Sequence, residues 1–355
     1  MKVRLGDYIQ EYSVKNKDDE NISVYSVTNT KGFCKDYFGK EVASKDKTTY
    51  KIVPYGYFAY NPSRINVGSV DWQRKEKKVI VSPLYNVFSV SPNLERQYLY
   101  YYLKSDFVLQ RIKAVATGSV RDNLKLSMLY EFPIELPKLE NQRKIVKILD
   151  KVSDVVEKKE QELEQLDTFV KSRFVELFGD PVINSMGWKK ALIGDDCFVT
   201  KLAGFEYTQY INYENSGDVV MVKAQNVKNG KLNRKELSFI SNEVSDSLPR
   251  SQLAPGDVVM TYVGANIGDV AIIDNEYKYH LAPNVAKIRP DSERYNSIYF
   301  MYMLMLLNAY IVKNSADTAK AALGMERIRK LNVFVPPIEL QNQFADFVVS
   351  VDKSK

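Results

Sequence analysis

The sequence has very few residues of the kinds that build metal sites, disulfides and most catalytic centres. Its 355 residues include two cysteines and one histidine. Two cysteines are too few for a disulfide framework or a zinc site, so Cys34 and Cys197 indicate a reducing compartment. The single histidine, His280, lies close to Pro283 and is more typical of a structural position than of a catalytic one.

Motifs for nucleotide and methyl-transfer chemistry are also missing. No Gly-x-x-x-x-Gly-Lys-Ser/Thr loop is present to hold a nucleotide phosphate. The Asn/Asp-Pro-Pro-aromatic loop of amino-methyltransferases is approached only by YNPS at residues 60–63, which departs from it at two positions. We therefore predict no catalytic, cofactor-binding or metal-binding residue in this chain, and a protein that is not an enzyme by itself.

The sequence has no hydrophobic run long enough to cross a membrane. The longest apolar stretch covers residues 298–312, whereas a membrane-spanning helix needs about 20 residues. The first ten residues, MKVRLGDYIQ, lack the continuous apolar core of an export signal. These features predict a buried helix over residues 298–312 and a cytoplasmic protein without a membrane partner.

What the sequence does have is a modest positive charge, distributed unevenly. The formal net charge is +6, yet residues 140–178 carry eight Lys or Arg against nine Asp or Glu. The whole excess therefore lies outside that stretch. A basic excess on globular parts is compatible with nucleic-acid binding, although many ordinary proteins share it.

The sequence also contains an internal repeat, in which the second copy follows the first after about 200 residues. Gly56, Gly68 and Pro83 recur at an offset of 200 as Gly256, Gly268 and Pro283. Near the end of each copy the offset is 199, where FPIELPKLENQRKIVKILDKV corresponds to LNVFVPPIELQNQFADFVVSV. Short solenoid repeats have periods of about 20 to 50 residues, so this period indicates duplicated domains.

Each copy shows the same order of predicted elements. Short strands around residues 24–27 and 219–222 lead into a glycine turn, and further strands follow Gly56, Gly256 and the two prolines. A helix rich in tyrosine or methionine comes later in each copy. Strands followed by helices predict an α+β fold for both modules, arranged as a pseudo-twofold internal repeat.

Residues 140–178 differ from both modules. Apolar residues recur there in alternating steps of four and three, which predicts a long coiled-coil-type helix that ends at Gly179, with Pro181 beyond. Phe344, Val348 and Val351 begin the same pattern in the second copy, so we expect the two helices to pair antiparallel. A mere linker helix is the alternative.

The ordered set of these features resembles the specificity subunit of a type I restriction-modification enzyme. The family's helix begins with Leu-Pro-Pro-Leu-x-Glu-Gln, and the corresponding segments here are LPKLENQ and VPPIELQ. Both replace the glutamate before the glutamine, with Asn141 and Leu340. Residues 118–137 also resemble the family's passage into that helix. The implied domains are recognition domains at 1–136 and 181–335, a central conserved helical region at 137–180 and a short distal one at 336–355.

The resemblance implies a DNA-binding subunit that reads a bipartite, asymmetric site in double-stranded DNA. It would direct adenine methylation and cleavage by partner chains, namely two methyltransferase subunits and the restriction-translocase subunits. S-adenosylmethionine, ATP and Mg are then expected in the partners and not in this chain. Self-association through the helices is a further possibility that the resemblance leaves open.

Candidate DNA-contacting residues are polar or basic positions that correspond in the two copies but differ in identity. Phosphates attract Lys, Arg and small hydroxyls, and base edges suit Arg, Asn and Gln. A basic cluster beside Trp72, without a counterpart in copy two, suits a phosphate-facing loop. The candidates are Thr28, Asn29, Lys31, Asn61, Arg64, Asn66, Arg74, Lys75, Lys77, Lys78, Lys223, Gln225, Asn226, Lys228, Thr261, Tyr262 and Asn266.

The helix of the second copy ends earlier in the sequence than a full repeat would require. At the offset of 199 it would have to reach position 377 or so to match Phe178, whereas the sequence given ends at Lys355. We therefore expect the far half of the central helix to lack an intramolecular cover and to bind a partner. The expected contact residues are Leu163, Leu166, Phe169, Val170, Phe174 and Leu177.

Two other readings stay open at this point. In one, the chain is the specificity chain of a type II-like system with a single bifunctional partner. In the other, it is a coiled-coil scaffold that binds proteins and not DNA. A steep loss of affinity for random duplex with salt would separate the DNA-binding readings from the scaffold.

Overall fold

The computed structural model describes residues 1–35, 46–116, 123–315 and 322–355. The chain divides into two compact units, residues 1–158 and 159–355. In the part of the chain that is described, no helix is long and apolar enough to cross a membrane. Of the passage at 118–137 that carries part of the resemblance, residues 118–122 lie outside the described residues.

The first unit is built on a four-stranded antiparallel sheet with the strand order β2-β9-β6-β7. Helices follow the strands, and their leucines fill the core behind this sheet. The elements are β1 (Lys2–Arg4), β2 (Ile9–Glu11), β3 (Ser26–Thr28), β4 (Gly32–Cys34), β5 (Lys51–Pro54), β6 (Phe58–Tyr60), β7 (Val70–Trp72), β8 (Lys78–Val81), β9 (Asn86–Val90), α1 (Arg96–Lys104), α2 (Asp106–Val115), α3 (Leu126–Tyr130) and β10 (Pro133–Glu135).

The second unit repeats this plan with the sheet β12-β21-β18-β19, and it extends the counterpart of the β5–β8 pair into the four-stranded sheet β16-β13-β20-β17. The elements are β11 (Lys190–Leu192), α5 (Ile193–Asp196), β12 (Cys197–Lys201), α6 (Gly204–Tyr210), β13 (Val219–Val222), β14 (Val227–Lys228), β15 (Lys231–Leu232), β16 (Phe239–Ile240), α7 (Asn242–Ser247), β17 (Gln252–Leu253), β18 (Val258–Thr261), β19 (Val270–Ile272), β20 (Lys278–Leu281), β21 (Val285–Pro290), α8 (Ser297–Ser315), α9 (Met325–Arg329), β22 (Asn332–Phe334) and α10 (Ile338–Ser354).

Recurring glycines explain why the repeat is visible in the sequence. Gly56 and Gly256 have φ values of 84° and 88°, and Gly68 and Gly268 have 86° and 83°. A side chain with a Cβ is strained in this left-handed region, so both units keep glycine at the same turns. The α+β fold and the internal repeat are thus confirmed.

The glutamine of the recurring helix start has the same role in both units. Gln142 is fully buried, accepts a hydrogen bond from Glu95 N at 2.8 Å and donates to the carbonyls of Asn93 and Pro137 at 3.0 and 2.9 Å. Gln341 is equally buried and has the corresponding three partners: Asn296 N, Arg294 O and Pro336 O. Each glutamine therefore ties its own helix, α4 or α10, to the loop that precedes α1 or α8.

The predicted long helix is α4 (Leu139–Phe178). It ends at Gly179, whose φ of 78° reverses the chain as a C-terminal glycine does. Every residue from 151 to 165 is exposed, including the apolar Val152, Val155 and Val156. The apolar run at 298–312 lies in α8 and is largely buried in the second unit, as predicted.

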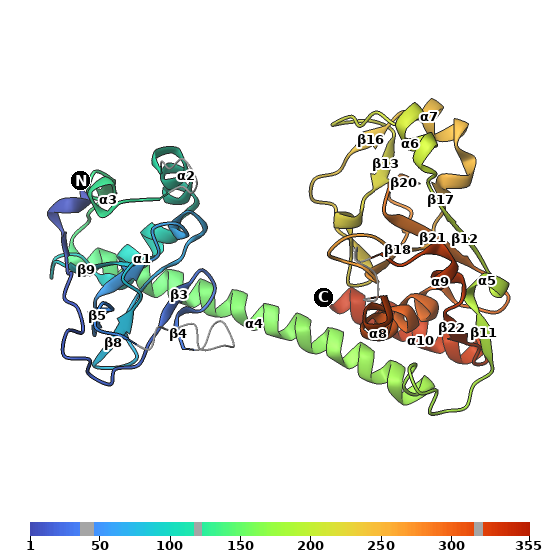
Figure 1. Ribbon diagram of the computed structural model, residues 1–355, viewed down its shortest axis with the longest axis horizontal. Coiled ribbons are helices and arrows are strands. Elements are labelled where there is room, and N and C mark those ends of the chain that lie inside the picture. The colour runs from blue at the N-terminus through green and yellow to red at the C-terminus, as the bar shows by residue number, and fades with distance from the viewer. Residues whose placement is uncertain (36–45, 117–122, 316–321) are drawn as a thin grey trace. The chain divides into compact units, whose positions relative to one another are not determined.

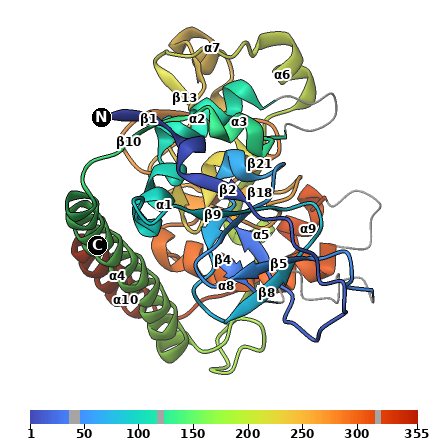
Figure 2. The ribbon, with the colours of Figure 1, turned by 90° about the vertical axis from the view of Figure 1, so that its left-hand side faces the viewer.

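The predicted antiparallel helix pair is present, but the expectation that the far half of α4 lacks an intramolecular cover is wrong. α10 lies beside α4 (Figure 1 and Figure 2), with Phe344 against Phe174 and Phe178, and Phe347 against Phe169. In an antiparallel pair the start of α10 must meet the end of α4, so the far half is the covered one.

The six proposed partner-binding residues accordingly divide into two groups. Val170 and Phe174 are buried in the core of the second unit, and Leu166 and Leu177 pack against that core. Leu163 and Phe169 are exposed. The exposed apolar positions of α4 lie mostly earlier, at Ile145, Ile148, Val152, Val155 and Val156.

Candidate nucleic-acid interface

The first group of candidates lies on the β3–β4 hairpin of the first unit. Thr28 is 5% exposed, and its hydroxyl accepts a hydrogen bond from Lys31 N at 3.0 Å, so it shapes the turn and does not face a ligand. Its assignment as a DNA contact is corrected for that reason. Asn29 and Lys31 are exposed at the tip of the same turn. The hairpin therefore presents these two side chains and Thr30 to solvent.

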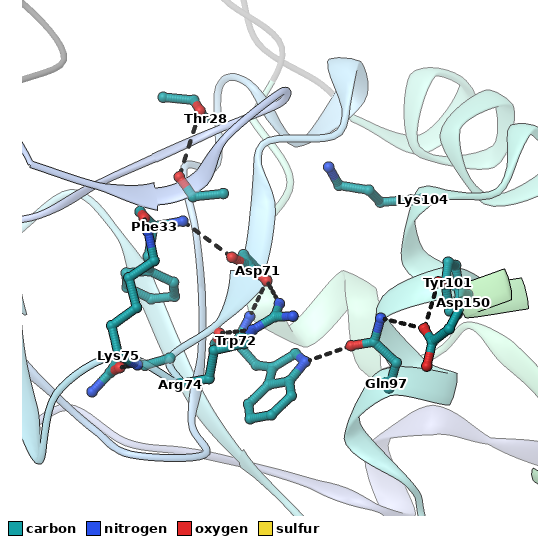
Figure 3. A network of polar contacts seen from close by, with 12 residues as sticks. Thr28, Phe33, Asp71, Trp72, Arg74, Lys75, Gln97, Tyr101, Lys104 and Asp150 are labelled. Carbon is teal, nitrogen blue, oxygen red and sulfur yellow. Dashed lines mark hydrogen bonds and ion pairs between the residues drawn. The ribbon is translucent and has the colours of Figure 1, made fainter. Parts of the chain in front are cut away.

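Asp71, which the sequence did not single out, holds this hairpin in place (Figure 3). Its buried carboxylate accepts hydrogen bonds from Phe33 N at 3.1 Å and Trp72 N at 2.8 Å and pairs with Arg74. Gly32 has a φ of 57°, and a Cβ there would lie 2.0 Å from Asp71 Oδ2. The turn can approach the carboxylate this closely only because residue 32 is glycine.

Two lysines add to the support of the hairpin. Lys104 of α1 donates to the carbonyl of Asn29 at 2.7 Å, and Lys75 donates to the carbonyl of Phe33 at 2.8 Å. Partial burial lowers the pKa of Lys104, whose ammonium also lies over the ring of Tyr100. The position of the exposed tip is thus fixed by side chains from β7, the following loop and α1.

The basic cluster at 74–78 is largely engaged within the protein. Arg74 stacks on Trp72, with its guanidinium carbon 4.4 Å from the ring centroid, and pairs with Asp71. Lys75 supports the hairpin, and Lys78 forms an ion pair with Glu20. Three of the four basic residues therefore have partners within the protein, although Arg74, Lys75 and Lys77 are all exposed.

The network continues from the hairpin to α4. The indole of Trp72 donates to Gln97 Oε1 at 3.0 Å, and Gln97 Nε2 donates to Asp150 of α4 at 3.3 Å. Tyr101 also donates to Asp150, at 2.7 Å (Figure 3). A continuous chain of polar contacts therefore connects the β3–β4 hairpin with α4, although the two are far apart in the sequence.

The second loop of candidates in the first unit follows β6. Asn61 accepts hydrogen bonds from the backbone and hydroxyl of Ser63, so its side chain stabilises the turn. Arg64 is exposed and Asn66 is half-buried. Arg64 is thus the accessible cation of this loop.

In the second unit, the hairpin that corresponds to β3–β4 uses one candidate for its own structure. Asn226 is 2% exposed, and its amide donates to the carbonyl of Asn233 at 2.8 Å, which corrects its assignment as a base contact. Lys223 donates to Ser238 at 2.9 Å, and Gln225 to Glu236 at 3.4 Å. Lys228 is exposed on the turn.

The loop after β18 contains one further correction. Thr261 is fully buried, so it cannot touch DNA, and its hydroxyl has no hydrogen-bond partner among the described residues. Tyr262 is half-buried beneath Lys201, whose ammonium lies 5.4 Å from the ring centroid. Asn266 is exposed. The accessible candidates of this unit are therefore Gln225, Lys228 and Asn266, and Lys223 and Tyr262 are partly accessible.

Among the described residues, no group of three or more His, Cys, Asp or Glu side chains is placed to hold a metal ion. Partial burial raises the pKa of the Cys197 thiol to about 12 and leaves it protonated at neutral pH. Burial also lowers the pKa of His280, so its imidazole is neutral at pH 7. The exposed polar turns are the chemically distinctive surface of both units.

Known proteins share this architecture and its sequence features. The family model described as the type I restriction modification DNA specificity domain matches residues 3–168 and 187–355. The MjaVIII type I specificity subunit of Methanocaldococcus jannaschii is 24% identical over 377 residues, covering 99% of this chain and 85% of that protein. The EcoBI specificity subunit of Escherichia coli is 21% identical, covering 86% of this chain and 70% of that protein.

Two solved structures share the fold. The S subunit of a type I system from M. genitalium has a TM-score of 0.55 at 14% identity, over 100% of this chain and 89% of that one. A chain from a structural study of complex assembly and conformational transition in a type I R-M system has a TM-score of 0.53 at 18% identity, over 100% and 90% of the two chains.

Proposed function

Since this chain belongs to the type I restriction modification DNA specificity family, we propose that it reads a two-part, asymmetric sequence in double-stranded DNA. As a type I specificity subunit, it selects the site at which partner chains act. The type II-like and scaffold alternatives are not favoured by its relatives, which are type I specificity subunits. Residues 1–136 and 181–335 are the proposed recognition domains, each reading one half of the site, and 137–180 and 336–355 are the proposed conserved helical regions.

One observation carries the two-reader proposal: a shared backbone frame presents different exposed side chains in the two units. The hairpin turn of the first unit exposes Asn29, Thr30 and Lys31, and that of the second exposes Lys228 and Asn229. Amide side chains suit base edges, and lysines suit phosphates or guanine. Two frames with unlike exposed sets would read unlike half-sites.

The chemistry of modification and cleavage belongs, in this proposal, to other subunits. Two methyltransferase subunits would supply S-adenosylmethionine-dependent adenine methylation, and restriction-translocase subunits would supply ATP- and Mg-dependent cleavage. The chain itself would have none of these activities and would act on DNA in the prokaryotic cytoplasm.

We place the methyltransferase contact on the exposed apolar residues of α4. Ile148, Val152, Val155 and Val156 are 62%, 55%, 59% and 51% exposed. Residues three and four apart share one face of a helix, so these side chains form a stripe. Exposed apolar stripes are typical of protein–protein contacts, and a helical partner would bury this one. Association of two copies of the chain through the same stripe is the competing use.

A domain exchange tests the two-reader proposal. The chain is expressed with its methyltransferase partner, and the methylated positions of the host genome are mapped. Replacing residues 1–136 with those of a related specificity subunit should change one half of the methylated sequence and leave the other half and the spacer unchanged. A simultaneous change in both halves would contradict the assignment of one half-site to each unit.

A smaller exchange tests the hairpin tip alone, and an exchange on α2 is its matched control. Exchanging only residues 29–31 alters the exposed tip and leaves Thr28 and Gly32, which shape the turn, in place. We expect altered preference within the same half-site. An equal exchange at exposed residues of α2, such as Phe107 and Lys113, should leave the methylated sequence as it was.

A further inference from the structure

A small cavity in the second unit is lined by three cations. It has a volume of about 300 Å³ and lies where the end of β12, the turn before β17 and α9 meet. None of its described lining residues carries a carboxylate. They are Thr200, Lys201, Ala203, Arg250, Met325 and Arg329.

The two arginines are held in position by groups at the edge of the cavity. Arg250 donates to both oxygens of Glu206, at 3.2 and 3.1 Å. Arg329 pairs with Glu326 at 2.9 Å and donates to the carbonyl of Val199 at 3.2 Å. A guanidinium has five N–H donors, so both side chains keep donors for a ligand while their geometry is fixed.

A buried lysine adds positive charge beside the cavity. Lys287 is 2% exposed, and its ammonium donates to the carbonyls of Arg250 and Gln252 at 2.8 and 2.7 Å. Lys201, Arg250, Arg329 and Lys287 carry four positive charges, against two negative charges on Glu206 and Glu326. The excess of two charges makes the cavity a site for an anion.

The first unit has neutral side chains at the three corresponding positions. The strand registers align Lys201 with Ser13 and Arg250 with Tyr50, and the repeat aligns Arg329 with Tyr130. Tyr130 even contacts the same strand as its counterpart does, because its hydroxyl accepts from Glu11 N at 3.2 Å. The fold therefore does not require cations here, and their presence in the second unit needs another reason.

We propose that this cavity binds a phosphodiester group of the DNA backbone, and that it is a contact which the second unit makes and the first does not. The inference rests on the proposed function, since it deepens the DNA contact assigned to the second unit. A cavity of about 300 Å³ has room for a phosphodiester group, and arginine forks and a lysine are its usual partners. Lys201 also covers Tyr262 and so connects the cavity to the candidate interface.

A protein ligand fits this cavity less well than a phosphate. Met325 is the one large apolar side chain among its described lining residues, whereas an acidic peptide would need apolar pockets to gain affinity. If the experiment below shows that substitutions in the cavity leave DNA binding unchanged, an acidic protein ligand becomes the alternative occupant.

The test is a salt titration of the full chain with a 20-base-pair duplex of random sequence. Each neutralised phosphate contributes about 0.9 to the slope of log affinity against log salt. Lys201→Gln and Arg329→Gln should each reduce the magnitude of the slope by about 0.9, and weaken binding about fivefold at 0.15 M salt. Lys330→Gln is the control, because it removes one positive charge from the next residue, which lines a different cavity.

Thermal melting of each variant verifies that the second unit remains folded. Arg329→Lys keeps the positive charge, so it should recover part of the salt slope that Arg329→Gln loses. If wild type shows a steep slope and neither glutamine variant changes it beyond Lys330→Gln, the cavity is not a phosphate site although the proposed function stands. If the wild-type chain binds duplex without salt dependence, the proposed DNA function and this inference both fail.

Discussion

The strongest prediction concerns Gln142 and Gln341, which make the same three hydrogen bonds in the two units. In each, one carboxamide oxygen accepts a backbone N–H and the amide nitrogen donates to two carbonyls. Gln142→Glu and Gln341→Glu keep the shape of the side chain and replace that nitrogen with an oxygen. The glutamate side chain then faces two carbonyl oxygens but lacks the two N–H groups that donated to them.

The size of the expected stability loss follows from the burial of both glutamine side chains, each 0% exposed. An ionised carboxylate at this position would be desolvated next to two acceptors. A protonated one can donate to only one of them, which leaves one buried carbonyl unsatisfied. An unsatisfied buried polar group costs about 1–3 kcal/mol, and displacing the pKa of the new carboxyl adds to that. We expect a loss of about 2–4 kcal/mol in the unit that carries the change.

Hydrogen exchange followed by mass spectrometry gives the effect for each unit separately. Gln142→Glu should lower protection at the start of α1, where Leu99 N donates to Glu95 O, and leave α8 unchanged. Gln341→Glu should do the reverse, at the start of α8. A loss of about 2–4 kcal/mol lowers the melting temperature of a unit of this size by about 5–15 °C.

Gln165→Glu is the matched control, since Gln165 is exposed on the same helix α4 as Gln142. It should change stability by less than about 0.5 kcal/mol. Equal stability losses in Gln165→Glu and Gln142→Glu, or loss of protection in both units from one variant, would refute the reasoning. The first outcome would mean that the buried hydrogen bonds contribute little.

Three further predictions follow from single sites. Asp71→Asn should cost about 1.5–3 kcal/mol, because a charged acceptor of two backbone N–H groups is lost. It should also relax methylation specificity in one half-site only, as genome mapping would show, whereas the exposed Asp18→Asn should not. Burial lowers the pKa of His280 below that of the unfolded chain, so the second unit should keep its full stability above pH 6.5 or so and lose stability as pH falls through the folded pKa, by at most about 1.4 kcal/mol per pH unit. Denaturation curves at pH 7.0 and 5.5 should show this loss in wild type and a smaller one in His280→Gln, and equal losses would count against it. Val152→Lys with Val155→Lys should abolish co-purification of methyltransferase subunits and reduce self-association in light scattering, with unchanged melting; a pair of changes at exposed Lys158 and Lys159 should do neither.

The sequence predicted those parts of the fold that single residue types enforce. Glycines with left-handed φ mark the same turns in both copies, and Gly179 ends α4 where the heptad pattern ends. The recurrence of Gln142 and Gln341 was visible as a motif, and the structure supplies its cause. These features are readable because only one residue type satisfies each backbone requirement.

The candidate contacts were less predictable, because the residues that suit DNA also suit turns. Asparagine and threonine cap turns with the same oxygen and amide groups that they would offer to bases. Thr28 and Asn226 do the former, as their burial shows. Asp71 was overlooked as a support for the hairpin because its partner Phe33 is 38 residues away and bonds through its backbone. A pattern of neighbouring residues in the sequence cannot reveal a contact between residues so far apart.

The two hairpins are held differently, and this difference bears on how each half-site can change. In the second unit, Gly230 is bonded through its backbone to β19, with Gly230 N to Val270 O at 2.9 Å and Ile272 N to Gly230 O at 3.2 Å. Asp71 of the first unit corresponds to Ala271 at the offset of 200, so there the same link is made by a carboxylate. A backbone link tolerates any side chain, whereas the carboxylate link depends on Asp71, Gly32 and Arg74 together. Substitutions in β7 should therefore disturb reading by the first unit more than equivalent changes in β19 disturb the second.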